Sequence, residues 1–349
     1  MCNFQLPAPY RRLALVVAMA LAVASPLTGA ADSASAGTEL TKVAFRLDGP
    51  YYGGHVPLIA GIKKGIYRKH GLDVTAAPGQ GSLIVVQLIA NGKVDFGFPD
   101  FGVLVRARAE NLPIRGIMGV QQKTPYLIVS KKERNIRTPK DLEDAKMGFV
   151  AAESSTRVFP LVARKAKIDL AKITSNATNV GDYGVRNALF FQGKVDTAFA
   201  YTTSLPSYKQ QCNCELSTIS MSDFGIRIMA NGIATSEAML QQHPDTVRRF
   251  LAATRESIEF AVKNPEEAVD LFFEYVGPIA LKRETVLAGW KAGIDLLRTD
   301  ATASMPIGCM AGSDWQGMTD QLLESGQIKQ APQVKTMYTN QFLVGCPES

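Results

Sequence analysis

Strand and helix patterns alternate most clearly in residues 43–82, which read VAFRLDGPYYGGHVPLIAGIKKGIYRKHGLDVTAAPGQGS. The apolar and β-branched runs at 42–47 and 72–76 predict two strands. Between them, residues 56–69 place apolar side chains at helical spacing, and Gly71 follows where a glycine commonly ends a helix. A strand, a helix and a second strand in this order are typical of an α/β protein.

The same alternation continues along the rest of the chain. A helix is predicted at 82–90, with Ser82 as its N-cap and Gly92 after its end. Further strands are predicted at 113–120, 126–130 and 146–150, and further helices at 244–263 and 265–276. With 349 residues, 46% hydrophobic and 20% charged, the chain has material for about two domains and is neither disordered nor fibrous.

An internal echo suggests that the two domains are built alike. The segment NGKVDFGF at 91–98 recurs as QGKVDTAF at 192–199, an offset of 192 − 91 = 101 residues. Each copy follows an apolar helical pattern and leads into a polar or aromatic loop. This spacing is far longer than that of a solenoid repeat, so it favours duplication of an α/β half over a repeat array. Chance similarity of two helix-glycine-strand junctions is the alternative.

Two extended segments, 126–130 and 226–230, bracket the second half and are expected to be crossovers between two lobes. We therefore predict a first lobe from 41–128, a second lobe from 129–229, and a return to the first lobe over 230–349 with C-terminal helices. Open α/β sheets bind ligands outside the carboxyl ends of their strands. Two such lobes facing each other would hold a ligand in the cleft between them and close over it by a hinge.

The N-terminus is predicted to be a secretory signal peptide over residues 1–30, followed by a linker over 31–40. Arg11 and Arg12 precede the apolar run LALVVAMALAV, which is shorter than a membrane span, and small residues follow it. Cleavage would leave 36 basic and 32 acidic residues, a net charge of 36 − 32 = +4. We expect a protein exported to the periplasm with no nucleic-acid partner.

The four cysteines beyond residue 30 are expected to form disulfides in such an oxidising compartment. Three connectivities are possible, and we favour Cys309 with Cys346 and Cys212 with Cys214. Neither these cysteines nor the three histidines have the spacing of a zinc site, so no metal or other cofactor is predicted.

Candidate ligand-binding residues gather in loops that follow strands and precede helices. Aromatic faces and carboxylates attract cationic or nitrogen-rich ligands, whereas helix N-termini attract anionic groups. An ordinary helix cap or a core aromatic is the alternative role for each residue. The candidates are Asp48, Tyr51, Tyr52, His55, Gly81, Ser82, Phe98, Asp100, Phe101, Glu153, Ser154, Ser155, Thr156, Tyr183 and Tyr201.

Catalytic motifs are missing from the sequence. There is no Gly-x-Ser-x-Gly elbow, Ser-x-x-Lys, His-Glu-x-x-His or phosphate-binding loop, and Ile84 replaces the third glycine of a dinucleotide fingerprint that begins at Gly79. The sequence therefore favours a binding protein over an enzyme.

Four segments together resemble the periplasmic solute-binding proteins of ABC importers. They are the stretch at 43–82, NGKVDFGF, KTPYLIVSKKERNIRTPKDLEDAKMGFV and HPDTVRRFLAATRESIEFAVKNPEEAV. The branch they resemble serves nitrate, sulfonates, taurine and the pyrimidine precursor of thiamine. The resemblance implies a two-lobed class II binding fold with two hinge crossovers, a monomer, and delivery of a small ligand to a membrane permease coupled to an ATPase.

Within that branch, the thiamine-precursor binders have a loop that Tyr52 and His55 match loosely. The residues Tyr51 to Gly54 depart from its aromatic and asparagine. A small organic ligand such as a pyrimidine-like heterocycle or an amine is expected. The alternatives are a sulfonate or nitrate receptor, a sensor partner, and a pyrimidine-synthase-like enzyme.

Overall fold

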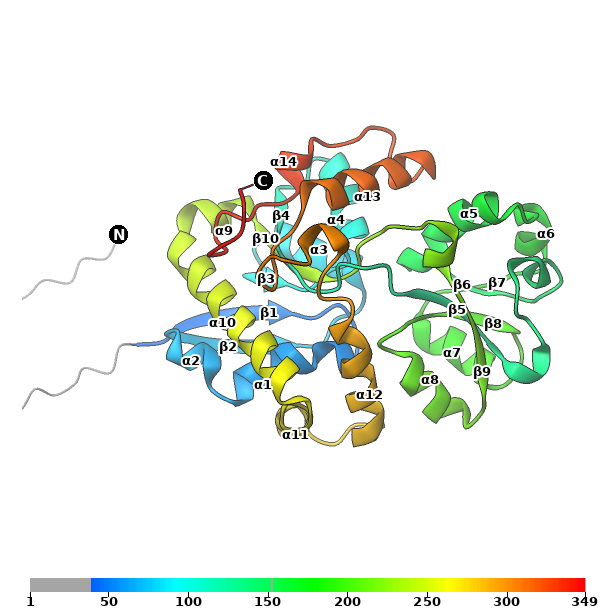
Figure 1. The fold of residues 1–349 in the computed structure, drawn as a ribbon, viewed down its shortest axis with the longest axis horizontal. Helices are drawn as coiled ribbons and strands as arrows, with labels where there is room; N and C mark the ends of the chain where they lie inside the picture. Colours follow the sequence, from blue (N-terminus) through cyan, green and yellow to red (C-terminus); the bar gives the residue numbers. More distant parts are fainter. Residues whose placement is uncertain (1–38, 152, 349) are drawn as a thin grey trace, which may run out of the picture. The chain divides into compact units, whose positions relative to one another are not determined.

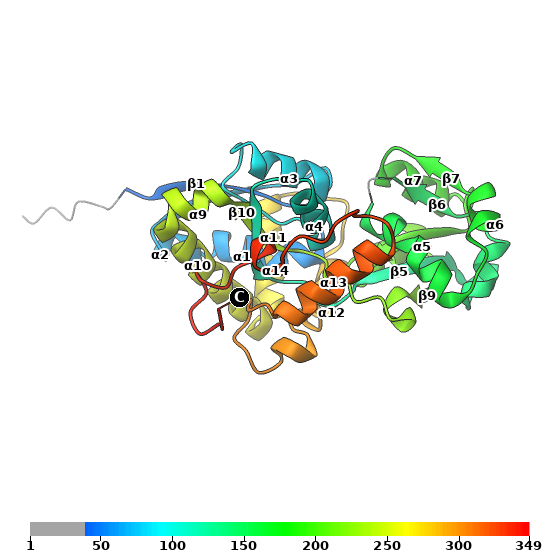
Figure 2. The same cartoon turned by 90° about the horizontal axis from the view of Figure 1, so that it is seen from above.

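The computed structural model describes residues 39–151 and 153–348. The predicted signal peptide and nearly all of the predicted linker lie outside these residues. The described chain is an α/β structure with two groups of elements, each built around its own sheet, and Figures 1 and 2 show the two groups separately from two directions. None of the helices within the described residues is apolar and long enough to span a bilayer.

The first lobe has a five-stranded mixed sheet in the order β2-β1-β3-β10-β4. Its strands are β1 (Thr41–Arg46), β2 (Leu72–Ala77), β3 (Phe96–Gly97), β4 (Ile114–Gly119) and β10 (Gly232–Ser236). β1 runs parallel to β2 and to β3, whereas β10 runs antiparallel to β3 and to β4. The returning chain thus inserts a strand into the middle of the sheet that the N-terminal part began.

The second lobe repeats this arrangement. Its strands are β5 (Tyr126–Lys131), β6 (Gly148–Val150), β7 (Thr178–Val180), β8 (Thr197–Tyr201) and β9 (Leu216–Ser220). β5 lies antiparallel between β8 and β9, β6 pairs parallel with β7, and a parallel bridge from Met147 to Thr197 joins the two sets. The order β7-β6-β8-β5-β9 matches the first lobe strand for strand.

Helices cover both sheets, and the sequence periodicity predicted the longest of them. In the first lobe they are α1 (Val56–Lys63), α2 (Ile66–Lys69), α3 (Ser82–Ala90), α4 (Phe101–Ala109), α9 (Glu237–Gln242), α10 (Pro244–Lys263), α11 (Pro265–Val276), α12 (Arg283–Ile294), α13 (Gly312–Glu324) and α14 (Val334–Met337). In the second lobe they are α5 (Ser154–Ala166), α6 (Leu170–Ser175), α7 (Tyr183–Phe191) and α8 (Leu205–Cys212). Short 3-10 turns occupy Gly53–His55, Lys132–Arg134, Pro139–Glu143, Met221–Phe224 and Asp300–Thr302.

The sequence echo corresponds to a shared structural unit. Gly92 and Gly193 both follow a helix with positive φ, 62° and 71°. In both copies the amide three residues after the last helical residue donates to a carbonyl inside the helix, Lys93 to Leu88 at 2.9 Å and Lys194 to Leu189 at 2.8 Å. This is the geometry of a glycine C-cap, in which the reversed φ lets the backbone turn back on the last helical turn.

The aspartate of each echo then joins the next strand to its neighbour. The Asp95 carboxylate accepts from the amide of Ala44 at 2.7 Å, and the Asp196 carboxylate accepts from the amide of Lys146 at 2.9 Å. The same residue thus fixes β3 beside β1 and β8 beside β6. The prediction of two similarly constructed halves is confirmed.

Three details of the sequence prediction are wrong. Residues 126–130 were predicted to be a crossover but form part of β5 in the second sheet. The chain crosses to the second lobe in the preceding segment, 120–125. The other predicted crossover, 226–230, does run between the lobes. The helix expected over 56–69 is broken at Gly65, which has φ of 78°. Ser82 is the first residue of α3, not its N-cap, and its hydroxyl accepts a hydrogen bond from the amide of Asp100 at 3.0 Å.

Both favoured disulfides are confirmed. Cys309 is bonded to Cys346, with the two Cα atoms 5.4 Å apart. Cys212 is bonded to Cys214, with Cα atoms 5.2 Å apart, and Asn213 between them adopts φ of 49°. The first bond ties the C-terminal segment to the first lobe, and the second closes the end of α8.

Candidate ligand-binding cleft

A cavity of about 550 Å³ lies between the two lobes, and residues from three parts of the chain line it. The first lobe supplies the loop after β1 and the start of α3. The second lobe supplies the starts of α5 and α7, the end of β8, and α8. The third wall is the connection between α11 and α12, which contributes Ile279, Ala280 and Leu281.

The first-lobe wall centres on Asp48, two residues after the end of β1. Its carboxylate oxygen lies 2.6 Å from Nε2 of His55, whose side chain is fully buried, while Asp48 keeps 15% of its side-chain surface exposed. The ring of Tyr52 packs on His55 with 4.1 Å between centroids. The amide of Gly81 donates to the Asp48 carbonyl at 2.7 Å and holds the start of α3 against this loop. His55, which is not among the lining residues, thus holds the Asp48 carboxylate in position.

The second-lobe wall contains a buried ion pair. Nη1 of Arg186 donates to the Glu153 carboxylate at 2.8 Å, and only 2% of the Arg186 side chain and 6% of the Glu153 side chain are exposed. Nη2 of Arg186 donates to the Tyr208 hydroxyl at 3.0 Å. Burial raises the pKa of the Glu153 carboxyl, and the Arg186 charge opposes that rise. Burial lowers the pKa of Arg186, but the Glu153 carboxylate more than offsets this and keeps the guanidinium charged.

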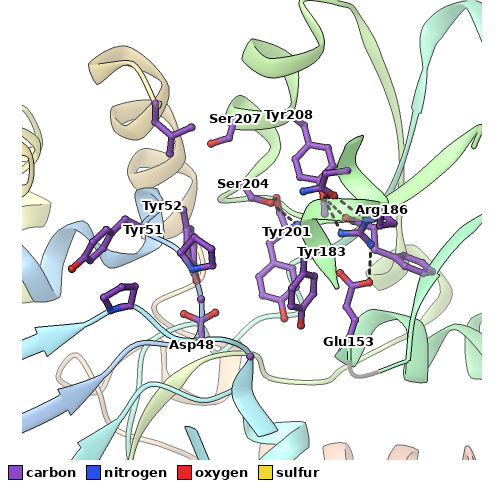
Figure 3. Close-up of a pocket in the computed structure, with 18 of the residues that line it drawn as sticks. Asp48, Tyr51, Tyr52, Glu153, Tyr183, Arg186, Tyr201, Ser204, Ser207 and Tyr208 are labelled. Atoms are coloured by element: carbon purple, nitrogen blue, oxygen red, sulfur yellow. Dashed lines mark hydrogen bonds and ion pairs between the residues drawn. The ribbon is translucent and has the colours of Figure 1, made fainter. Parts of the chain in front are cut away.

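Two further tyrosines form an aromatic face on the second lobe. Figure 3 shows the rings of Tyr183 and Tyr201 side by side, facing Asp48 across the cavity. Tyr201 ends β8, and Tyr183 begins α7, where Asp182 caps the helix by accepting from the amide of Val185 at 2.9 Å. Burial raises the pKa of both tyrosines, so both phenols are neutral at physiological pH.

The charge of the lining is unevenly distributed. Among the described residues that line the cavity, Asp48 and Glu153 are the acids and Arg186 is the one cation. Because Arg186 is already paired with Glu153, Asp48 has no cationic partner among these lining residues; its own partner is the His55 ring, which lies outside the lining at 2.6 Å. The lining thus carries two acids and one cation, with apolar and neutral phenolic surface around them.

Nine of the predicted site residues line the cavity. They are Asp48, Tyr51, Tyr52, Gly81, Ser82, Glu153, Ser154, Tyr183 and Tyr201. Tyr51 lines it at the margin, because its ring points away from the second lobe and packs edge-on against Phe272 of α11 at 6.0 Å between centroids.

Six predicted residues lie outside the lining, and five of them make packing, capping or other hydrogen-bonding contacts instead. Those of the first lobe are His55, already described, Phe98, which packs edge-on against His55 at 5.9 Å, and Phe101, which packs on Trp315 at 4.8 Å. Asp100 is buried and caps α4 by accepting from the amide of Val103 at 3.2 Å.

Asp100 also accepts from the Tyr126 hydroxyl at 2.5 Å. Burial raises the pKa of its carboxyl, and the Tyr126 hydrogen bond opposes the rise. In the second lobe, Thr156 accepts from the amide of Val150 at 3.3 Å and donates to Glu153 at 3.2 Å, and Ser155 is fully buried. The aromatic and acidic residues at these strand ends are therefore largely core and capping residues.

Sequence reasoning missed Arg186 and the residues of α8. Arg186 is one helical turn after Tyr183, and a lone arginine among the apolar residues of YGVRNALFF was a usable signal. Ser204, Ser207, Tyr208 and the third wall gave no such signal. They reach the cavity only because α8 and the α11–α12 connection meet in the folded chain.

The two similar lobes and the cavity between them define the periplasmic-binding-protein fold. The solved structure of the alkanesulfonate-binding protein SsuA from Xanthomonas axonopodis pv. citri, bound to MOPS, has this fold. It superposes with a TM-score of 0.65 at 11% identity, covering 85% of this chain and 96% of that one. The chain belongs to the family described as NMT1/THI5 like, which matches residues 53–268.

Two relatives of the chain differ in what their names say they do. The riboflavin-binding protein RibY of Chloroflexus aurantiacus is 23% identical over 244 residues, 68% of this chain and 67% of RibY. A 4-amino-5-hydroxymethyl-2-methylpyrimidine phosphate synthase of Legionella pneumophila is 23% identical over 232 residues, 62% of this chain and 68% of the synthase. The chain is thus similar both to a binding protein and to an enzyme, so function must be argued from the site.

Proposed function

We propose that the protein is an exported solute-binding receptor of an ABC importer, and that its cleft captures a flat nitrogen-containing heterocycle or an amine. The observation that carries this proposal is the lining: neutral tyrosine faces around Asp48, a carboxylate with no cationic partner among the described lining residues, with the guanidinium already paired. The receptor would deliver its solute in the periplasm to a membrane permease and its ATPase.

The side chains that line the cavity indicate which ligand chemistry it favours. Tyr183 and Tyr201 supply ring faces on which a planar solute can stack, and Asp48 accepts hydrogen bonds from amino or ring N–H groups. Cationic character in the solute would be favoured by both the carboxylate and the ring faces. RibY, a relative named for a heterocyclic solute, agrees with this preference.

An anion receptor of the sulfonate or nitrate type is the second candidate, and one observation favours it. Ser82 and Ser154, the first residues of α3 and α5, both line the cavity, and helix N-termini attract anions. An anion would have to lie near Asp48 and Glu153 without a free guanidinium among the lining residues that the structure describes. The charge balance therefore favours the first candidate.

A thermal-shift screen of the ligand-stripped protein tests the proposal. A ligand that binds only the folded state stabilises it by about 2.7 kcal/mol when present at roughly 100 times its Kd. The panel contains riboflavin, aminopyrimidines, primary amines, taurine and other sulfonates, and nitrate. A shift with a heterocycle or amine is expected. A shift confined to sulfonates or nitrate would contradict the heterocycle assignment, and turnover of a bound pyrimidine precursor would contradict the receptor.

Asp48→Asn sharpens this test. The loss of the carboxylate is expected to weaken an amino-heterocycle or amine by about tenfold or more, because hydrogen bonds to a charged group contribute about 1.5–3 kcal/mol. Asp73→Asn is the matched control, because Asp73 lies on the same lobe, outside the lining, and pairs with Arg68 at the surface. Equal affinities of the two variants for the ligand would show that the Asp48 carboxylate does not contact it.

A further inference from the structure

We propose that Gln210 is a positioning residue that fastens the third wall of the cleft to the second lobe and thereby slows release of the solute. The inference rests on the proposed function for the identity of the solute, whereas the fastening itself stands on the hydrogen bonds described next. We call Gln210, the connection 277–282 and Thr285 the interlobe clasp.

Gln210 uses both ends of its side-chain amide across the lobe boundary. Its Nε2 donates to the carbonyl of Ala280 at 3.1 Å. Its Oε1 accepts from the amide of Lys282 at 3.1 Å and from the hydroxyl of Thr285 at 2.6 Å. One side chain of α8 thus holds the carbonyl before the start of α12, the amide at its start, and a hydroxyl in its first turn.

The clasp acts on the cavity although Gln210 does not line it. Ile279, Ala280 and Leu281 form the third wall, and Ala280 is directly hydrogen-bonded to Gln210. The wall is a connection without regular secondary structure, so its own backbone has no ladder to hold it. Lys282, at the N-cap of α12, gives that helix no side-chain cap. Gln210 therefore supplies from the opposite lobe the order that this segment lacks.

A second contact brings the same two elements together. Figure 1 shows α8 beside α12, and the two helices pack against each other. A Cβ atom at Gly289 of α12 would lie 2.5 Å from the carbonyl oxygen of Thr203, two residues before the start of α8. This approach leaves no room for a side chain. The backbones of the two lobes thus meet next to the clasp, which sets Gln210 within reach of its three partners.

Hydrogen exchange on the full-length exported protein tests the fastening without any ligand. The amide of Lys282 reports the clasp because it donates to Gln210. In Gln210→Ala, loss of three hydrogen bonds is expected to speed exchange at Lys282 by about tenfold or more. Thr285→Val removes one of the three and should have a smaller effect. Lys209→Ala changes an exposed neighbour on α8 and should have none.

The conservative variant separates positioning from general stability. Gln210→Glu keeps the oxygen that accepts from Lys282 and Thr285 but loses the donor to Ala280, so slow exchange at Lys282 should be largely restored. The melting temperature of each variant is measured in parallel. Exchange in Gln210→Ala equal to that of Lys209→Ala would overturn the clasp, and so would fast exchange that simply follows a global loss of stability and is not rescued by Gln210→Glu.

Dissociation of riboflavin, followed by its fluorescence, tests the consequence for the solute. Gln210→Ala is expected to release riboflavin at least about threefold faster than Lys209→Ala. Equal release rates with altered exchange would overturn the role in retention. If riboflavin does not bind the unsubstituted protein, that result counts against the proposed ligand class and not against the clasp. The exchange rate at Lys282 still decides whether the clasp exists.

Discussion

At the scale of the residue, the buried pair of Glu153 and Arg186 has the largest electrostatic consequence. Each ion is buried and depends on the other for compensation, with a further hydrogen bond from Arg186 to Tyr208 and from Thr156 to Glu153. Removing one partner of such a pair leaves an uncompensated charge, which is far more costly than losing an exposed pair. The second-lobe wall of the cleft is thus built on an interaction that tolerates little change.

Arg186→Met is expected to lower the free energy of unfolding by about 3–5 kcal/mol at neutral pH. In this variant burial raises the folded-state pKa of Glu153 with no guanidinium to oppose it, so the folded state binds the proton more tightly than the unfolded state. The free energy of unfolding of the variant then falls as pH rises through that pKa. The destabilisation relative to the unsubstituted protein should therefore be smaller near about pH 5 than near about pH 8. Urea unfolding at both pH values measures it.

Arg164→Met is the control for this substitution. Arg164 pairs with Glu324 at the surface, where 55% and 43% of the two side chains are exposed. Its loss should cost no more than about 1 kcal/mol. A similar cost for both variants would contradict the assignment of Glu153 and Arg186 as a buried pair that supports the wall.

At the scale of the element, the two lobes share one helix-to-strand junction. In each, a glycine with positive φ ends the helix and an aspartate three residues later pins the following strand. The junction depends on backbone conformation more than on packing, because Gly92 has no neighbour within 4 Å of an added Cβ and Gly193 has only Arg134, at 4.0 Å.

Gly92→Ala and Gly193→Ala should therefore each destabilise the protein by about 1 kcal/mol, because alanine resists positive φ. Asparagine at either position should cost less. Gly317→Ala is expected to change stability in the opposite direction, since Gly317 lies within α13 and an added Cβ there meets nothing within 4 Å. Denaturant unfolding of the three variants compares them, and a neutral Gly193→Ala would show that the turn does not require glycine.

This junction also shows why part of the fold was predictable. Glycine caps, helical periodicity and the NGKVD and QGKVD echoes are local signals, and they located α10, α11 and the two matching halves. The assignment of 126–130 as a crossover was wrong because an extended segment looks the same whether it crosses between lobes or pairs within a sheet. Phe101 and Asp100 could not be separated from cleft residues for a similar reason, since their contacts come from α13 and β5, which are distant in sequence.

At the scale of the whole molecule, the Cys309–Cys346 bond closes a loop with a sequence separation of 37 and holds the last segment on the first lobe. The Cys212–Cys214 bond has a separation of 2 and constrains only the end of α8. A cross-link restricts the unfolded chain more when the loop it closes is longer. The two bonds should therefore contribute very differently to global stability.

Replacing both Cys309 and Cys346 with alanine should lower the free energy of unfolding by about 3–4 kcal/mol, whereas the same change at Cys212 and Cys214 should cost about 1–2 kcal/mol. Chemical denaturation of the two double variants measures the difference. A larger loss from the Cys212 and Cys214 variant would mean that α8 and the interlobe clasp matter more for global stability than the C-terminal cross-link does.

The strand order of the first lobe has a consequence for the chain as it leaves the ribosome. β10, residues 232–236, lies between β3 and β4, so nothing made before residue 232 can join those two strands. The second sheet, by contrast, uses the uninterrupted stretch from β5 to β9. The first sheet therefore cannot be completed until residues 232–236 are available, whereas residues 126–220 contain every strand that the second lobe needs.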